Sequence, residues 1–334
     1  MDVKKIKKCC FIIVYFGQFN NYFPLFLKSC AKNADFNWLV ITDDETKYNY
    51  PENFIVKKMS FKKLRDLVQS KFDFPIALET PYKLCDYKPA YGYLFEGYLS
   101  EFQFWGHCDT DTIMGDLSNF ITDDLLKKYD KLFCLGHMVL YRNSYETNRV
   151  FMHDYKGISL YKNAFTTNSI ATFDEEYLYD NNINRIFLAE NRPVYIKDFS
   201  FNFHMSYYRF VRVEYIGKYK EKSKYGYLAE SYRNAIYLWD HGHIVRYMKK
   251  GARLVFEEMA YIHLQKRKML FSSDLLLNDV VKIIPNCFCE LEYPIITLDN
   301  FDKIKKWDSQ MEIAGSFIRR NLIKIKEKID LWKK

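Results

Sequence analysis

The first half of the chain alternates short apolar runs with amphipathic segments, and this alternation limits the folds it can adopt. Each apolar run has the length of a buried strand, and each amphipathic segment has the spacing of a helix with one buried face. Strands separated by helices pair in parallel, so we expect an α/β fold with a mostly parallel sheet flanked by helices. The expected strands cover residues 9–16, 38–42, 54–58, 102–105 and 131–135, and the expected helices cover 22–32, 60–72 with a cap at Ser60, and 82–99 with a break at Pro89.

The second half of the chain is less regular, but it contains no linker, internal repeat or low-complexity segment. We therefore expect one continuous domain over residues 1–312, followed by a C-terminal helix over 313–334. Within the domain, the pattern predicts a helix over 173–191, a strand over 194–197, a hairpin over 232–247 that turns at 240–242, and a helical segment over 257–261.

Two aspartates lie directly after one of the expected strands. Asp109 and Asp111 follow the apolar run 102–105 and Gly106. Side chains at positions i and i+2 of an extended segment point the same way, so these carboxylates can converge on one point. Converging carboxylates repel each other unless a cation lies between them, and Mn²⁺ or Mg²⁺ accepts such ligands and completes its shell with phosphate oxygens. We expect a metal site here; the alternative is a solvated turn in which an aspartate caps the next segment.

Other polar residues follow strands at the same edge of the expected sheet. Asp43 comes after the strand 38–42, and His137 comes after the strand 131–135. In α/β proteins, ligands bind beyond the carboxyl ends of parallel strands. Three polar clusters at one edge indicate a binding site more strongly than Asp109 and Asp111 do alone.

A second group of polar residues lies far along the chain, in the segment 261–267. His263 is a candidate third metal ligand, and Lys266 or Arg267 could neutralise the charge of a diphosphate. The alternative is a basic surface turn.

A third group lies in the segment 82–92. Lys83 and Asp86 are i, i+3 neighbours on an expected helix, a spacing typical of a surface ion pair. The functional alternative places both side chains in the wall of a donor pocket.

Composition excludes several classes of protein. Hydrophobic residues make up 49% of the chain and charged residues 28%, which are values of a globular protein.

The eight cysteines are scattered among the expected elements, so we expect reduced thiols rather than disulfides or a zinc site. The net charge is +8, and the segment 315–334 carries seven basic and two acidic residues, 7 − 2 = +5 of that excess. The rest of the chain is close to neutral, so nucleic acid is not an expected partner.

The basic C-terminal segment has an apolar stripe. Ile318, Leu322, Ile325, Ile329 and Trp332 recur at spacings of 4, 3, 4 and 3 residues. Such a helix can lie in the interface of an anionic membrane. Packing against its own domain or against a second copy of the chain is the alternative.

Five segments, taken together and in this order, resemble a known family. They are YKLCDYKPAYG, FWGHCDTDTIMGDL, LGHMVLYRN, FDEE and YIHLQKR. They are similar to segments of bacterial glycosyltransferases found among capsule and surface-polysaccharide genes, over roughly residues 8–285.

This resemblance implies the GT-A class, with a Rossmann-like nucleotide-binding sheet, a D-x-D metal site that usually holds Mn²⁺, and a nucleotide-sugar donor. Asp109 and Asp111 would hold the metal and the donor diphosphate, and His263 would be the late metal ligand. Asp43 and the turn formed by Tyr15, Phe16 and Gly17 would contact the nucleoside.

Glycosyl transfer requires a stabilised leaving diphosphate and an acceptor hydroxyl placed beneath the anomeric carbon. Lys266 and Arg267, together with the metal, would stabilise the leaving group. An inverting enzyme also needs a carboxylate base, for which Asp174, Glu175 and Glu176 are the candidates. These acidic residues could instead complement the dipole at a helix N-terminus, and a retaining enzyme needs no such base.

We therefore expect a metal-dependent glycosyltransferase that uses a nucleotide-sugar, most simply a UDP-sugar, to extend a surface polysaccharide or a lipid-linked oligosaccharide. The alternative from another class is a non-catalytic carbohydrate-binding or assembly protein; a metal-dependent phosphohydrolase would need more ligands near Asp109. No stretch of the chain reaches the ~20 apolar residues of a membrane span. The expected location is the cytoplasm, with a peripheral position on the inner face of the plasma membrane as an option.

Overall fold

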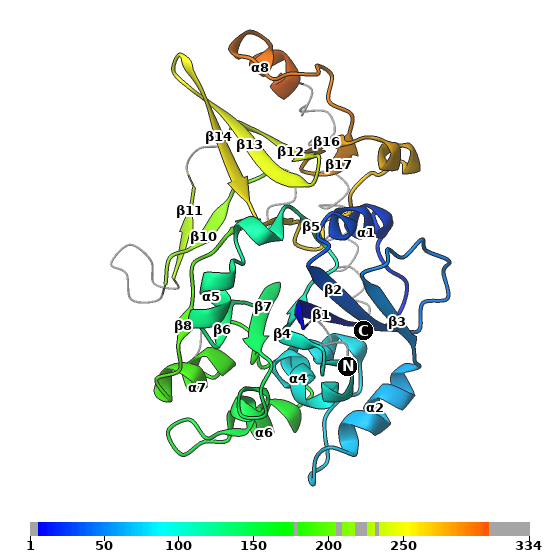
Figure 1. The fold of residues 1–334 in the computed structure, drawn as a ribbon, viewed down its shortest axis with the longest axis vertical. Coiled ribbons are helices and arrows are strands. Elements are labelled where there is room, and N and C mark those ends of the chain that lie inside the picture. The colour runs from blue at the N-terminus through cyan, green and yellow to red at the C-terminus, as the bar shows by residue number, and fades with distance from the viewer. Residues whose placement is uncertain (1–5, 177–179, 205–208, 218–225, 231–233, 307–334) are drawn as a thin grey trace, which may run out of the picture.

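The computed structural model describes residues 6–176, 180–204, 209–217, 226–230 and 234–306 of the 334 (Figure 1). The predicted α/β class is confirmed: a seven-stranded sheet forms the centre, and only β7 runs antiparallel to its neighbours. In pairing order its strands are β3 (Phe54–Lys58), β2 (Phe36–Thr42), β1 (Lys7–Tyr15), β4 (Phe102–Cys108), β7 (Met138–Arg142), β6 (Lys131–Leu135) and β8 (Val194–Tyr195).

Helices pack against both faces of this sheet (Figure 1). Along β1, Cys9, Phe11 and Ile13 enter one core while Cys10 and Ile12 enter the other. A strand buried on both faces reads as a continuous apolar run in the sequence. The helices are α1 (Phe23–Ala31), α2 (Phe61–Gln69), α5 (Asp123–Lys128), α6 (Leu160–Phe165) and α7 (Ile183–Ala189), with short 3₁₀ turns at Leu117–Asn119, Thr147–Met152 and Ser273–Leu277.

The segment 82–99, expected to be helical with a break at Pro89, is a series of short helical turns with several breaks. Pro89 begins a new turn, and Gly92 packs so tightly that a Cβ there would lie 2.2 Å from the Trp105 ring. The pieces are η1 (Pro81–Lys83), α3 (Leu84–Tyr87), η2 (Lys88–Ala90), α4 (Tyr91–Leu94) and η3 (Glu96–Tyr98). The cap of α2 is as predicted, because the Ser60 hydroxyl accepts from the Lys63 amide.

The last part of the described chain forms a five-stranded antiparallel sheet, which lies above the main sheet in Figure 1. The hairpin expected over 232–247 is confirmed, with its turn at His241 and Gly242. The strands, in pairing order, are β14 (Arg253–Met259), β13 (His243–Lys250), β12 (Ala235–Asp240), β16 (Val280–Ile284) and β17 (Cys287–Cys289), and α8 (Leu298–Lys306) packs on the sheet. A two-stranded sheet pairs β10 (Val213–Tyr215) with β11 (Tyr227–Ala229).

Two helix predictions are wrong. Residues 257–259 belong to β14 and Tyr261 begins β15 (Tyr261–His263), because the ladder with β13 pairs seven residues and overrides the helical preference of Glu257 and Glu258. Residues 173–176 form a turn rather than the start of a helix, and α7 begins only at Ile183, after a cap by Asn182.

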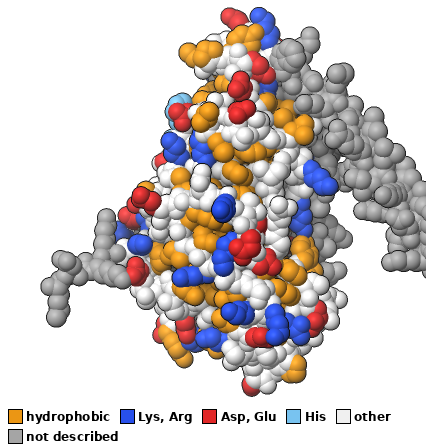
Figure 2. All heavy atoms as spheres, turned by 90° about the vertical axis from the view of Figure 1, so that its right-hand side faces the viewer, with side chains coloured by type: hydrophobic (Ala, Val, Ile, Leu, Met, Phe, Trp, Pro, Cys, Tyr) orange, Lys and Arg blue, Asp and Glu red, His pale blue; other side chains and the backbone are white. Residues whose placement is uncertain are grey.

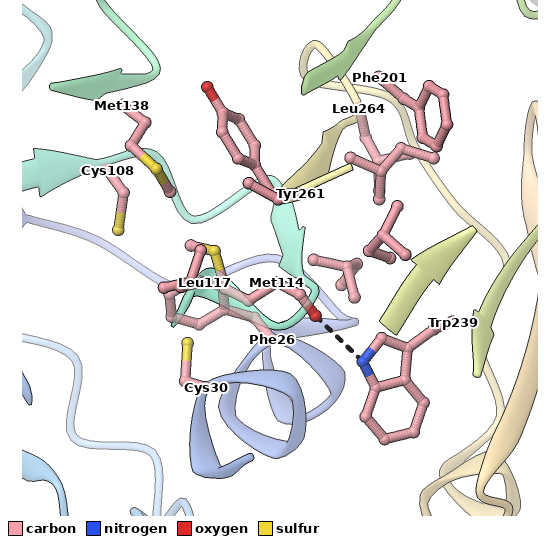
Figure 3. Close-up of a cluster of buried hydrophobic side chains, with 14 of the residues drawn as sticks. Phe26, Cys30, Cys108, Met114, Leu117, Met138, Phe201, Trp239, Tyr261 and Leu264 are labelled. Atoms are coloured by element: carbon pink, nitrogen blue, oxygen red, sulfur yellow. Dashed lines mark hydrogen bonds between the residues drawn. The ribbon is translucent and has the colours of Figure 1, made fainter. Parts of the chain in front are cut away.

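A small sheet joins distant parts of the chain. Its strands are β5 (Thr112–Met114), β15, and β9 (Ser200–Asn202), with β15 in the centre. Figure 3 shows the apolar cluster around this sheet, in which the Trp239 indole donates to the Met114 carbonyl at 3.1 Å. The cluster holds β15 against the end of β4.

All eight cysteines are free thiols, as expected, and five of them are buried. Among the described residues, no helix is long and apolar enough to cross a membrane. The predicted helix over 313–334 lies outside the described residues. On the face shown in Figure 2, basic and acidic side chains lie interspersed rather than in a field of one sign.

Candidate metal and nucleotide site

Asp109 and Asp111 lie in a tight turn between β4 and β5. The Asp109 amide donates to the His137 carbonyl at 3.0 Å, and the Thr112 hydroxyl donates to the Asp109 carbonyl at 2.7 Å. The first bond attaches the turn to the loop after β6 and the second closes the turn, so the predicted meeting of the two strand ends is correct.

His263 reaches the two aspartates through the small sheet. It pairs with Thr112 of β5 on one side and with Asn202 of β9 on the other. One ligand atom each from Asp109, Asp111 and His263 lie within 4.8 Å of one another, and this is the one such group of three found in the described part of the chain. The structure therefore brings together all three residues predicted as metal ligands.

The His263 ring is oriented by its neighbours. Its Nδ1 lies 3.0 Å from Asn202 Oδ1, which also accepts from the side-chain Nε2 of Gln265 at 2.9 Å. Because that oxygen is an acceptor, Nδ1 carries a proton, and Nε2 faces Asp111, 3.4 Å from Oδ1. Two carboxylates and one imidazole nitrogen suit a divalent ion such as Mn²⁺, which accepts both oxygen and nitrogen ligands.

Electrostatics in the metal-free protein are consistent with a cation site. Burial alone would raise the pKa of Asp111, but His263 and the Lys266 amide bring that pKa below its usual range. Burial alone would lower the pKa of His263, and the Asp111 carboxylate raises it above its ordinary value. The two form an ion pair, and a divalent cation would displace the His263 proton, because a ligand imidazole must be neutral.

Lys88 is a residue of this site that sequence reasoning missed. Its Nζ lies 2.8 Å from Asp109 Oδ1, 2.8 Å from the Gly136 carbonyl oxygen and 3.4 Å from Asp174 Oδ2. Burial would lower the pKa of Lys88, but the two carboxylates raise it well above its ordinary value. Lys88 thus stays protonated and connects a candidate metal ligand to Asp174.

Asp174 and Glu175, two of the candidate bases, line the cavity at this site together with Asp109 and Asp111. Burial raises the pKa of Asp174 to about 7 against the opposing charge of Lys88, and burial also raises the pKa of Glu175. A Cβ on Gly136 would lie 2.7 Å from Asp174 Oδ2 and 3.1 Å from Glu175 Oε2, so any other residue there would make these carboxylates shift. A carboxyl group with a pKa near 7 can accept a proton at neutral pH.

Glu176, the third predicted base, has a structural role instead. It is buried in an ion pair with Arg185, and its amide donates to the Cys134 carbonyl at 2.8 Å. The turn at 173–176 directs it away from the cavity wall that Asp174 and Glu175 line.

Lys83 and Asp86 form an ion pair of 2.7 Å whose side chains are 2% and 0% exposed, so the expected surface pair is wrong. They also lie outside the cavity wall. Asp86 accepts from the amides of Ala171 and Phe173, and Lys83 donates to the Ser169 carbonyl. The pair therefore fixes the segment that leads into Asp174.

The loop after His263 carries the predicted basic residues. Gln265 and Lys266 both adopt left-handed backbone angles, with φ of 54° and 57°, which brings the Lys266 amide within 2.6 Å of Asp111 Oδ2. The Lys266 ammonium contacts the hydroxyl and the ring of Tyr82 at the cavity wall. Arg267 is buried and donates to the His204 carbonyl at 3.1 Å. Both basic residues line the cavity.

One cavity of about 1660 Å³ connects these groups. Tyr15 and Phe16 line it, as expected for a nucleoside contact, but Asp43 and Gly17 do not. Asp43 is exposed and accepts from the Gly17 amide at 2.7 Å, so it holds the turn that presents Tyr15 and Phe16. His137, also predicted at this site, lies in the wall beside His263.

A protein-family model described as a family of unknown function, DUF6625, matches residues 11–292. The chain belongs to the DUF6625 family. None of the curated proteins compared with the chain matches it. The match takes in every residue of the candidate site named above and ends before α8, so the site lies within the DUF6625 region.

In this DUF6625 protein, some site residues carry no signal in the sequence. Lys88 lies in a broken run of turns, and its partners at positions 109, 136 and 174 come from three separate loops. Asn202 is an ordinary residue of a short strand. Asn202 reaches His263 only because β9 pairs with β15 in the folded protein. No local sequence pattern predicts that pairing.

Proposed function

We propose that this protein is a metal-dependent glycosyltransferase that transfers a sugar from a nucleotide-sugar, most simply a UDP-sugar, to a glycan acceptor. The observation that carries the proposal is the group formed by Asp109, Asp111 and His263 at the carboxyl edge of a mostly parallel sheet. That edge is where α/β folds bind nucleotides, and the ligand set accepts a cation that also coordinates phosphate.

The basic residues around the cluster support a diphosphate as the ligand. Lys266 and Arg267 line the cavity beside Asp111, and a leaving diphosphate needs such positive charge as the glycosidic bond breaks. A bound Mn²⁺ would add electrostatic stabilisation of the same leaving group. Tyr15 and Phe16, at the end of β1, offer aromatic faces to a nucleobase.

The size of the cavity supports two substrates. Its volume of about 1660 Å³ exceeds the range of about 300–1,000 Å³ that single small-molecule sites occupy. A nucleotide-sugar and the end of a glycan acceptor can thus be held together, as transfer requires.

In the proposed reaction the acceptor hydroxyl oxygen bonds to the anomeric carbon, and the bond from that carbon to the diphosphate oxygen breaks. In an inverting enzyme, Asp174 or Glu175 takes the hydroxyl proton; in a retaining enzyme, the departing phosphate oxygen can take it. Lys88 holds Asp109 and Asp174 in fixed relation, so the metal ligand and the candidate base keep one geometry.

The acceptor and the location remain part of the proposal. We infer a growing surface polysaccharide or a lipid-linked oligosaccharide as the acceptor, and a cytoplasmic protein that can lie on the inner face of the plasma membrane. The support is the resemblance of the sequence motifs and the basic apolar stripe between Ile318 and Trp332, which lies outside the described residues.

A screen of nucleotide-sugars tests the proposal. The full chain with Mn²⁺ should release a nucleoside diphosphate from one donor when a glycan acceptor is present, and chelation by EDTA should stop the release. Rapid donor hydrolysis without an acceptor would indicate a phosphohydrolase instead. Glycan binding without any metal-dependent nucleotide affinity would indicate a carbohydrate-binding protein.

A further inference from the structure

Tyr82 and three residues of the segment 170–175 form an accessible part of the cavity wall. Tyr82 lies in η1, lines the cavity and is 61% exposed. Ile170, Thr172 and Glu175 line the same cavity; Ile170 is 40% exposed, and the other two are half-buried. Apolar and aromatic side chains with a few polar groups are the usual lining of a small-molecule site. This wall has that composition, and its side chains can be reached from the cavity.

The buried pair of Lys83 and Asp86 holds both parts of the wall in place. The Lys83 ammonium donates to the Ser169 carbonyl at 2.6 Å, which attaches η1 to the segment 169–173. The Asp86 carboxylate accepts from the backbone amides on either side of Thr172, at 2.9 and 3.0 Å. Because this ion pair is shielded from water, the relative position of the two segments is fixed before any ligand arrives.

Thr172 has a strained backbone at this wall. Its φ of 53° lies in the left-handed region, which a β-branched residue rarely adopts. Its hydroxyl donates to the Ala171 carbonyl at 2.7 Å, so the hydroxyl oxygen keeps lone pairs that can accept from a ligand. Strain of this kind persists where the surrounding structure enforces it, and it is concentrated at ligand-binding sites. The strain therefore supports a binding role for the segment.

Two lysines relate this wall to the candidate metal site. The Lys266 amide donates to Asp111 Oδ2 at 2.6 Å, and its ammonium donates to the Tyr82 hydroxyl at 2.8 Å and lies 4.2 Å from the ring centroid. One lysine residue thus spans the distance from a candidate metal ligand to the aromatic ring. The Lys88 ammonium connects the metal site to Asp174 in a similar way. Both the ring and a candidate base are therefore neighbours of the metal site.

The chemistry of the wall matches a sugar ring. One face of a pyranose carries C–H groups, which pack on aromatic and aliphatic side chains, and its hydroxyls need polar partners at the edge. Tyr82 and Ile170 offer the apolar surface, whereas Thr172 and Glu175 offer oxygens that accept from hydroxyls. The sugar beside a candidate base is the one whose hydroxyl loses a proton, so the wall suits the acceptor rather than the donor.

We propose that the wall formed by Tyr82, Ile170 and Thr172 binds the terminal sugar of the acceptor glycan, with Tyr82 packing against the C–H face of the ring. The pair of Lys83 and Asp86 positions this subsite without touching the sugar. This inference rests on the proposed function, because it gives the acceptor a place in the same cavity.

The test begins with an array of glycans that present hexoses, N-acetylhexosamines, deoxyhexoses and uronic acids. The full chain is applied to the array together with Mn²⁺ and UDP. Calorimetry in Mn²⁺ then measures the affinity of each variant for the best-bound glycan, for UDP and for UDP-glucose.

Three variants and two matched controls separate the contributions to binding. Y82A removes the aromatic surface, Y82F keeps the ring but loses the bond to Lys266, and T172G removes both the hydroxyl and the strain. Y145A is the control for Y82A, because Tyr145 is 70% exposed, has the Arg149 guanidinium over its ring and lies outside the cavity wall. K156G is the control for T172G, because Lys156 has a left-handed φ of 51° and also lies outside the wall.

We expect Y82A to weaken the selected glycan about 10-fold or more, because the aromatic packing surface is lost, and Y82F and Y145A to stay close to the wild type. T172G should raise the thermal midpoint, since glycine adopts this backbone without strain, and should weaken the glycan about 3- to 10-fold through the lost hydrogen bond. K156G should shift the midpoint in the same direction without any loss of glycan affinity. Binding of UDP by Y82A should match the wild type.

Several outcomes would overturn the inference. Equal glycan affinity of Y82A and the wild type would do so, and so would an array on which the wild type binds no glycan; UDP binding with Mn²⁺ would leave the proposed function intact in both cases. A loss in Y82A that affects UDP-glucose but not the glycan would assign the wall to the donor sugar. If the wild type binds neither UDP nor UDP-glucose with Mn²⁺, the proposed function fails and the wall is not an acceptor subsite.

Discussion

Replacing Lys88 by methionine tests how the charges of the site are balanced. The substitution keeps the apolar stem and removes the ammonium that lies between Asp109 and Asp174. Removing one partner of a buried ion pair costs about 3–5 kcal/mol. Two features reduce the cost here: the Asp109 side chain is 35% exposed, and Asp174, with a pKa of about 7, can take up a proton near neutral pH. We expect K88M to lower the free energy of unfolding by about 2–3 kcal/mol at about pH 8.

The loss of stability in K88M should depend on pH, because Asp174 changes its protonation state near neutral pH. The pKa of Asp174 is raised from 3.8 to about 7 in the folded protein, so the carboxyl is protonated at about pH 5.5 with or without Lys88. The deficit of K88M should therefore shrink on going from about pH 8 to about pH 5.5. Mn²⁺ restores positive charge beside Asp109, so it should stabilise K88M more than the wild type.

Urea denaturation of both proteins at the two pH values, with and without Mn²⁺, measures these differences. K127M is the control, because Lys127 is 79% exposed and its loss should leave stability unchanged. If K88M behaves like K127M at both pH values, Lys88 is not the counter-ion of Asp109 and Asp174.

Three further predictions concern other parts of the chain. D111N should abolish metal-dependent turnover yet cost only about 1–2 kcal/mol of metal-free stability, because the amide oxygen still accepts from the Lys266 amide; turnover close to that of the wild type would contradict this. Burial raises the pKa of Cys10 and Cys85 from 9.0 to about 12, so their stabilising contribution is complete below pH 9 and is lost as the pH rises toward 12; urea midpoints that do not fall over this range would contradict it. Deleting residues 315–334 should reduce sedimentation with anionic vesicles more than activity on a soluble acceptor, and unchanged sedimentation would disprove a membrane role for the segment.

The central sheet is well predicted from the sequence, because strands buried on both faces appear as continuous apolar runs. The strand at Phe54–Lys58 has the predicted bounds, and β1 and β2 differ from their predicted ranges by at most two residues at either end. The polar residues at the strand ends were predictable for the same reason, since parallel strands direct their carboxyl ends to one edge.

Where local preference and tertiary pairing disagree, prediction from sequence fails. Glu257 and Glu258 favour a helix, yet the ladder with β13 makes them part of a strand. The acidic run from Asp174 to Glu176 looks like a helix start, yet the buried pair of Lys83 and Asp86 fixes the segment before it as a turn.

The site is predictable only in part. His263 could be proposed as a metal ligand from its residue type and basic neighbours, and the structure places it with Asp109 and Asp111. The contacts that orient these ligands, from Lys88 and Asn202, depend on which loops meet in three dimensions. The periodicity of apolar residues along the chain does not show which loops contact each other in the folded protein.

The central claim is that Asp109, Asp111 and His263 hold one divalent cation that also binds the diphosphate of a nucleotide. Pulsed electron paramagnetic resonance of the protein with Mn²⁺ and UDP tests it directly, because the Mn²⁺ spin couples to the nuclei of its own ligands. The account predicts one bound Mn²⁺ with nitrogen coupling from a single imidazole, lost in H263A, and phosphorus coupling from UDP. Bound Mn²⁺ that shows neither coupling, or that keeps its nitrogen coupling in H263A, would contradict it.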